Sequence, residues 1–136
     1  MSVQIIPVQL PRDITPKDDL IELLINTKTG RQIKNGDILI FTQKIISKQE
    51  GKKIQLSKVK PTLFATGIAS AYNKDPRIVQ LILDETKRII RMKNGIIISE
   101  TRHGLVCANA GIDESNIEEG FATLLPKDAD KSAQKL

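Results

Sequence analysis

A near absence of large aromatic side chains is the feature that most limits how this chain can build a core. Aromatic residues make up 3% of the 136 positions and tryptophan is absent, although 40% of the residues are hydrophobic. Isoleucine, leucine and valine must therefore supply the packing. Such residues suit strands covered by helices, and the length fits one domain. We expect an α+β fold with a mixed β-sheet and flanking helices.

The charge balance favours an anionic partner. The chain has 21 Lys and Arg residues against 16 Asp and Glu, a formal net charge of +5. Modules that bind nucleic acid by stacking need aromatic side chains beside the basic groups. The three Phe and one Tyr lie outside the basic runs. A small phosphorylated ligand is thus favoured over nucleic acid.

Cysteine usage and hydropathy indicate the compartment. Cys107 is the single cysteine, which excludes an internal disulfide and is typical of a reducing environment. No apolar stretch approaches the roughly 20 residues of a membrane helix, and the first residues lack the features of a signal peptide. We expect a cytoplasmic protein that does not enter a membrane.

The apolar pattern predicts two strands and a helix in the first third of the chain. Residues 3–8 form a short β-branched run that predicts a strand. A helix is expected to begin at Thr15 and Pro16 and to end before Gly30. Residues 37–42 form a continuous apolar run, which predicts a strand covered on both faces of a sheet.

The remainder of the chain predicts helices, a hairpin and a tail. Helices are expected over 61–72 and again after Asp75 and Pro76, which have cap and first-turn chemistry. The Asn94–Gly95 pair predicts a hairpin turn. Residues 115–118 have the pattern of a capping box, and residues 127–136 are small and charged, which indicates a loose tail.

The first candidate site is residues 42–48, directly after the predicted buried strand. Ligands often gather where strands end, and Lys44 and Lys48 share a face if this stretch is helical. Two ammonium groups could hold two phosphates of a nucleotide. A solvated basic face is the more frequent meaning of this spacing. No glycine-rich phosphate loop is present.

The second candidate site is residues 109–116, which precede a predicted helix start. Asp113 offers a hard oxygen donor for Mg²⁺ or Mn²⁺, and Asn116 could donate an amide to a ligand. An Asx turn that shapes the helix entry is the commoner role for such residues. A single carboxylate does not make a metal site, so further ligands must come from elsewhere.

The third candidate site is Arg102 and His103. The arginine offers a planar fork for a carboxylate or phosphate, whereas a hydrogen-bonded loop pair is the commoner outcome. One histidine and one cysteine cannot complete a zinc shell. An unrelated hydrolase that uses His103 stays open, although no GxSxG motif supports it.

Three ordered motifs together resemble a known family. They are residues 36–51, residues 75–85 and residues 100–116, and residues 124–130 continue the last one. The combination resembles the coenzyme F420:L-glutamate ligases, also called gamma-glutamyl ligases, over essentially the whole chain. The resemblance implies a family-specific α+β fold, here incomplete.

The resemblance also implies an activity. These ligases use GTP to activate a carboxylate of F420-0, and L-glutamate then attacks to form an amide bond. Mg²⁺ or Mn²⁺ is implied as cofactor, K⁺ as an additional ion, and a homodimer as the assembly. Phosphoryl transfer depends on positioning and charge neutralisation, so no catalytic residue is assigned.

Site residues follow from the resemblance by position. The implied metal ligand is Asp113. Arg102 and His103 remain candidate substrate contacts from the chemistry of their side chains and not from the resemblance. The implied GTP contacts are Leu10, Pro11, Arg12, Asp13, Gln43, Lys44, Lys48 and Asn116.

The family chain is nearly twice as long, which defines the expected organisation. Residues 1–136 correspond to the N-terminal part of the ligase domain, residues 127–136 to a loose tail, and the C-terminal half is absent. We then expect the chain to be a fragment or a natural truncation that is inactive on its own, with a separate C-terminal chain as the partner that would complete it. The alternative is a non-catalytic basic domain that binds a partner protein or nucleic acid with a steep salt dependence.

Overall fold

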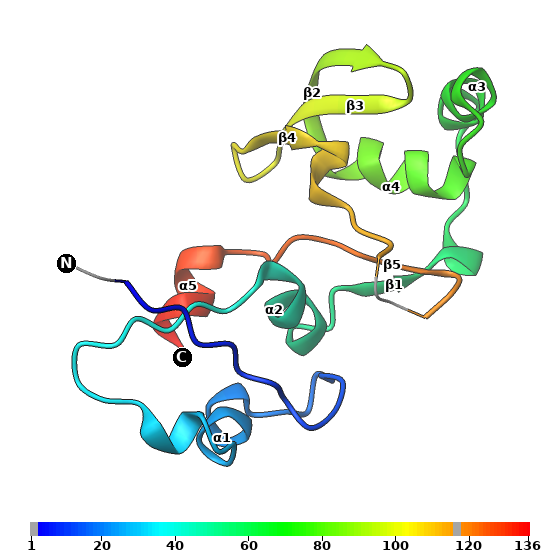
Figure 1. Cartoon of the computed structure of the whole chain (residues 1–136). Helices are drawn as coiled ribbons and strands as arrows, with labels where there is room; N and C mark the ends of the chain where they lie inside the picture. The colour runs from blue at the N-terminus through cyan, green and yellow to red at the C-terminus, as the bar shows by residue number, and fades with distance from the viewer. Residues whose placement is uncertain (1–2, 116–117) are drawn as a thin grey trace.

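A computed structural model of the chain describes residues 3–115 and 118–136, and its elements form two lobes joined by a narrow sheet (Figure 1). One lobe carries α1 (Leu20–Ile25), α2 (Gln43–Gln49) and α5 (Ala129–Gln134). The other carries α3 (Leu63–Tyr72), α4 (Pro76–Glu85) and the strands β2 (Thr86–Lys93), β3 (Ile96–Thr101) and β4 (Val106–Ala108). Three short 3-10 turns are η1 (Gly30–Gln32), η2 (Leu56–Lys58) and η3 (Asn109–Gly111).

The lobe of α3 and α4 matches the local sequence signals. Asp75 caps α4 by accepting a hydrogen bond from the Arg77 amide (2.8 Å), and Pro76 occupies the first turn. Asn94 and Gly95 both have positive φ, 51° and 76°, as a two-residue hairpin turn requires. The hairpin of β2 and β3 and the two helices are therefore confirmed.

The main core lies between these helices and the antiparallel sheet ordered β2-β3-β4. Buried aliphatic side chains come from η2, from both helices, from β3, and from the segments that follow the sheet. They are Leu56, Ala65, Ile68, Ala69, Ile78, Val79, Leu81, Ile82, Ile97, Ala110 and Ala122. Among the described residues this core contains no aromatic side chain, in agreement with the sequence.

The second sheet joins the two lobes. Strand β1 (Lys53–Gln55) pairs antiparallel with β5 (Phe121–Thr123), so that Lys53 lies opposite Thr123. The α+β class is thereby confirmed. The described strands form two small antiparallel sheets, however, and not one mixed sheet, because neither sheet brings two strands side by side in the same direction.

The α1 helix begins later than the sequence predicted. Asp19, and not Thr15, is the cap: its Oδ1 accepts hydrogen bonds from the amides of Ile21 (2.9 Å) and Glu22 (3.0 Å). The preceding residues form a turn that Asp18 organises, since the Thr15 amide donates to its carboxylate at 2.7 Å. The earlier helix start is therefore wrong, because side-chain hydrogen bonds stabilise the turn.

Both strands predicted in the first third of the chain are wrong. Residues 3–8 and 37–42 lie outside every strand of the described chain, and apolar side chains along both are exposed. An apolar run predicts burial only when another element covers it, and no described strand pairs with either segment.

The last residues are partly helical where a loose tail was expected. Helix α5 begins after Asp128, whose Oδ1 accepts from the Lys131 amide at 3.0 Å. The Ser132 hydroxyl donates to the carboxylate of Glu50, which ties this helix to the end of α2. Within the described ranges, no helix is long and apolar enough to cross a membrane.

Gly111 connects η3 to the segment that carries Asp113, and its replacement tests this connection. Gly111 has φ of +73°, and an added Cβ would lie 2.7 Å from Cδ2 of Leu125. We expect Gly111→Ala to lower the free energy of unfolding by roughly 1–3 kcal/mol, measured by urea denaturation. The matched control Gly67→Ala adds a methyl group to α3 with no atom within 4 Å. It is expected to raise the free energy of unfolding by roughly 0.5–1 kcal/mol. Equal losses of stability in the two variants would contradict the close approach of Gly111 to Leu125.

Candidate functional site

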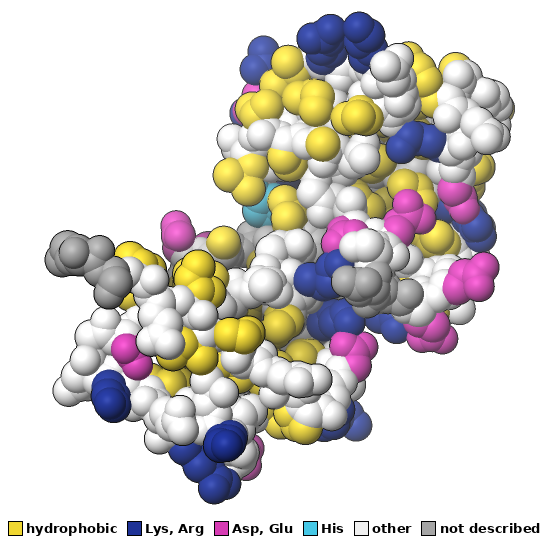
Figure 2. All heavy atoms as spheres, in the orientation of Figure 1, with side chains coloured by type: hydrophobic (Ala, Val, Ile, Leu, Met, Phe, Trp, Pro, Cys, Tyr) yellow, Lys and Arg dark blue, Asp and Glu magenta, His cyan; other side chains and the backbone are white. Residues whose placement is uncertain are grey.

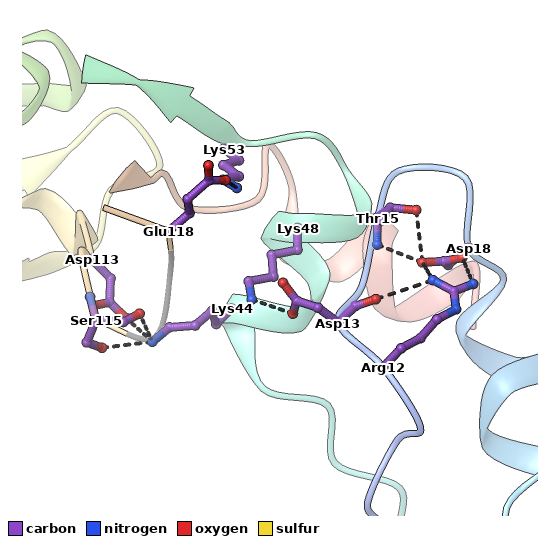
Figure 3. A network of polar contacts seen from close by, with 10 residues as sticks. All are labelled: Arg12, Asp13, Thr15, Asp18, Lys44, Lys48, Lys53, Asp113, Ser115 and Glu118. Carbon is purple, nitrogen blue, oxygen red and sulfur yellow. Dashed lines mark hydrogen bonds and ion pairs between the residues drawn. The ribbon is translucent and has the colours of Figure 1, made fainter. Parts of the chain in front are cut away.

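Helix α2 presents two lysines to two acidic segments from distant parts of the chain (Figure 3). Lys44 Nζ lies 2.7 Å from Asp113 Oδ2 and donates to the Ser115 hydroxyl at 2.8 Å. Lys48 Nζ lies 2.6 Å from Asp13 Oδ1. Because the lysines are four residues apart, they project from the same side of the helix. The solvated basic face considered above is thus replaced by two ion pairs.

The backbone on both sides of Asp113 is held by an isolated bridge to β5. The Asp113 amide donates to the Thr123 carbonyl at 3.1 Å, and the Thr123 amide donates back at 2.8 Å. Asp113 Oδ1 also accepts from the Ser115 amide at 2.8 Å, which is an Asx turn. The carboxylate therefore shapes its own loop and also faces Lys44.

The N-terminal loop is folded by Asp18 so that Asp13 faces α2. The Arg12 guanidinium pairs with both carboxylate oxygens of Asp18, and its Nη1 lies 2.8 Å from Oδ2. The same carboxylate accepts from the amide and hydroxyl of Thr15 at 2.7 and 3.0 Å. Arg12 is thus engaged inside its own loop, whereas Asp13 is free to contact Lys48.

These contacts keep the carboxylates charged. The Arg12 hydrogen bond holds the pKa of Asp18 well below its usual range. The hydrogen bond from Lys48 lowers the pKa of Asp13. Burial raises the pKa of Asp113, but the hydrogen bonds from Lys44 and Ser115 together outweigh it and the net pKa is lowered. Each of the two ammonium groups is therefore paired with a charged carboxylate. A phosphate group that bound here would compete with these carboxylates for the lysines.

Removal of the Lys44 ammonium is expected to raise the pKa of Asp113. A lowered folded pKa means that the ion pair stabilises the fold above about pH 4, the unfolded value, and that this contribution is lost as pH falls through the folded pKa. Carbon NMR titration of the Asp113 carboxyl in Lys44→Met checks the shift. Lys60→Met removes an exposed lysine outside the site, so a shift of equal size in that variant would refute the pairing.

The described residues do not form a protein-only metal centre. No group of three or more His, Cys, Asp or Glu side chains within 3–115 and 118–136 could hold an ion. Asp113 supplies one carboxylate beside Lys44. Mg²⁺ is often bound by one or two carboxylates together with substrate phosphates and water, so a single carboxylate is compatible with an ion that arrives with a nucleotide.

The other residues named from the sequence occupy different places. Gln43 Nε2 donates to the Ser47 hydroxyl (2.5 Å) and the Leu124 carbonyl (3.3 Å), which anchors α2. Arg102 and His103 lie on the exposed turn after β3, at a cavity of about 990 Å³ that Gln43 also lines.

Two of the remaining predicted contacts, Leu10 and Pro11, have apolar side chains. Leu10 packs against the small core below α2, and Pro11 is exposed. Asn116 lies outside the described residues, as do the central positions of the predicted capping box.

Sequence reasoning missed three residues that organise the site. Ser115 was treated only as a helix cap, yet its hydroxyl and carbonyl both accept from Lys44. Thr15 was assigned to a helix start, which placed Asp18 inside that helix, although their three-residue spacing is also typical of a side-chain-bonded turn. That spacing was the available signal, whereas nothing local indicated the Lys44 contact, which spans 71 positions.

Comparison with known proteins supplies the family. The profile of the F420-0:gamma-glutamyl ligases matches residues 8–136. The chain belongs to this family. The resemblance inferred from the motifs is thereby confirmed.

Curated relatives in the family are similar along the whole chain. The coenzyme F420:L-glutamate ligase of Methanothermobacter thermautotrophicus is 44% identical over 138 residues, covering 100% of this chain and 55% of that protein. The ligase of Methanopyrus kandleri is 42% identical, with 99% and 52% covered. That of Archaeoglobus fulgidus is 36% identical, with 100% and 53% covered. The chain therefore spans about half the length of these relatives.

Proposed function

We propose that this chain provides the nucleotide-phosphate-binding part of a GTP-dependent ligase that joins L-glutamate to F420-0. Family membership supports the reaction, since the relatives are named coenzyme F420:L-glutamate ligases. The observation that carries the site is the meeting of Lys44 with Asp113 and of Lys48 with Asp13 around one helix. The proposed reaction transfers a phosphoryl group from GTP to a carboxylate of F420-0, which releases GDP. The amine of L-glutamate then displaces phosphate and forms the amide, and further glutamates are added by gamma linkage.

The residues would act by positioning and charge neutralisation. Lys44 and Lys48 exchange their carboxylate partners for phosphate oxygens of GTP, because a phosphate offers more charge to the same ammonium groups. Asp113, released from Lys44, would then supply one carboxylate to hold Mg²⁺ or Mn²⁺. When bound, such an ion neutralises charge on the phosphates. Further ligands come from the nucleotide and from the other half of the family fold.

The cavity beside Gln43 is proposed to receive the acceptor. Arg102 and His103 lie at this cavity together with the apolar side chains of Phe41 and Leu125. A planar guanidinium recognises carboxylate and phosphate groups, whereas apolar walls suit a ring system. This arrangement would hold the acidic arm of F420-0 at Arg102.

The remaining family expectations complete the proposal. Leu10, Pro11, Arg12 and Asn116 are proposed as further GTP contacts. K⁺ is proposed as an additional ion, and the working assembly as a homodimer completed by the other half of the fold. The family-specific ligase fold is thus expected to be complete only in that assembly.

Nucleotide-dependent thermal stability tests the proposal. GTP with Mn²⁺ is expected to raise the melting temperature, since a ligand at 100 times its Kd stabilises by about 2.7 kcal/mol. ATP with Mn²⁺ should raise it less. No shift at millimolar GTP would contradict a nucleotide site in this chain. The non-catalytic alternative predicts a different result. The chain would then bind nucleic acid whichever nucleotide is present, and this binding would weaken steeply with salt.

A further inference from the structure

The two lobes have very unequal cores. The core between α3, α4 and the β2-β3-β4 sheet draws on side chains from several layers. The core below α2 contains only three buried side chains among the described residues: Ile14, Leu20 and Ile46. A domain needs a larger apolar interior than this to be stable. The lobe of α1 and α2 therefore lacks part of its packing.

Large aliphatic side chains on the same lobe remain in solvent. Val3 and Ile5 are 92% and 90% exposed, and Ile38 and Ile40 are 86% and 87% exposed. Apolar side chains are visible on the surface of this lobe in Figure 2. The residues between and beside them are exposed as well, with Ile6 at 59% and Leu39 at 46%, so each segment is open to solvent along its length. Monomeric proteins seldom leave such runs uncovered.

The backbone of both segments is also unpaired. Residues 3–8 and 38–41 make no backbone hydrogen bond to another described residue. Both segments adjoin the same small core, because Leu10 follows the first, Phe41 belongs to the second, and both pack on that core. Together they present unpaired backbone amides and carbonyls beside exposed apolar side chains, without a covering layer.

We propose that residues 3–8 and 38–41 become strands by pairing with strands from the part of the family fold that lies outside the match to this chain. The relatives match along 52–55% of their length, so a segment nearly as long as this chain lies outside the match. Strand addition would pair the free amides and cover Ile38 and Ile40. Added strands from this segment would explain why the small core below α2 and the exposed apolar segments lie in the same lobe.

Co-expression with a defined partner tests the proposal. The probe is the segment of the Methanothermobacter thermautotrophicus ligase that this chain does not match, with a tag for purification. We expect a stable 1:1 complex with this chain. The double variant Ile38→Lys/Ile40→Lys is expected to weaken it by about tenfold or more, because burying unpaired ammonium groups is unfavourable. Hydrogen exchange at residues 38–41 should slow on complex formation.

A matched variant separates the edge from general apolar contact. Leu63→Lys/Ile90→Lys adds the same charge to exposed positions of the other lobe, where Leu63 is 93% and Ile90 47% exposed. It should bind as the unmodified chain does. Failure of the unmodified chain to form the complex would overturn the proposal, as would unchanged affinity of Ile38→Lys/Ile40→Lys or unchanged exchange at 38–41. Self-association of this chain through the same residues would overturn it in favour of a second copy. None of these readouts requires GTP, so they are independent of the proposed nucleotide site.

Discussion

Replacing Lys44 with alanine is expected to weaken GTP binding by about 10- to 100-fold, since hydrogen bonds to charged groups contribute about 1.5–3 kcal/mol. Lys44 contacts both Asp113 and Ser115, which places its ammonium where the acidic loop and α2 meet. Calorimetric titration of GTP with Mn²⁺ gives the Kd directly. Lys48→Ala should also weaken binding, because its ammonium lies one helical turn away.

The control for this loss is Lys60→Ala, which removes the same charge from an exposed position between η2 and α3. Its GTP affinity should remain within about twofold of that of the unmodified chain. Salt screens the general effect of losing one positive charge at a distance. The melting temperature of Lys44→Ala without nucleotide should change little, because partly exposed ion pairs contribute about 0–1 kcal/mol. Equal losses of affinity in Lys44→Ala and Lys60→Ala would refute a specific phosphate contact.

Truncation of Ile82 is expected to give the largest loss of stability. Ile82 in α4 is 0% exposed within the main core. Ile82→Ala should lower the free energy of unfolding by about 2–5 kcal/mol, a large part of the roughly 5–15 kcal/mol available to a domain. Urea denaturation followed by circular dichroism measures the change.

Ile90 provides the comparison on the β2-β3 hairpin, where its side chain is 47% exposed. Ile90→Ala should cost about 1 kcal/mol or less. A loss in Ile82→Ala no greater than that in Ile90→Ala would show that α4 does not pack on the sheet as described.

Local signals accounted for the lobe of α3 and α4. The Asp75–Pro76 cap and the Asn94–Gly95 turn act through neighbouring residues, so their structural effect is contained in the sequence nearby. Residues 3–8 and 37–42 behaved differently. Their apolar patterns predicted two strands, of which residues 37–42 were expected to be buried, but pairing and burial depend on a covering element that the described chain lacks.

The candidate site was predictable in part. The spacing of Lys44 and Lys48 indicated one helix face, and family resemblance pointed to Asp113. Their contact could not follow from periodicity, because it depends on how α2 meets the Asp113 loop, which the Thr123 bridge holds in place. The turn made by Thr15 and Asp18 was missed because cap chemistry and turn chemistry use the same residue types.

Paramagnetic broadening by Mn²⁺ tests most directly whether Lys44, Lys48 and Asp113 surround the triphosphate of GTP. In amide NMR spectra of the chain, substoichiometric Mn²⁺ with GTP should broaden the signals of residues 43–48 and 113–115. The signals of the β2-β3 turn at Asn94 and Gly95 should persist. Broadening that is the same without GTP, or that spares residues 43–48 and 113–115, would contradict the account.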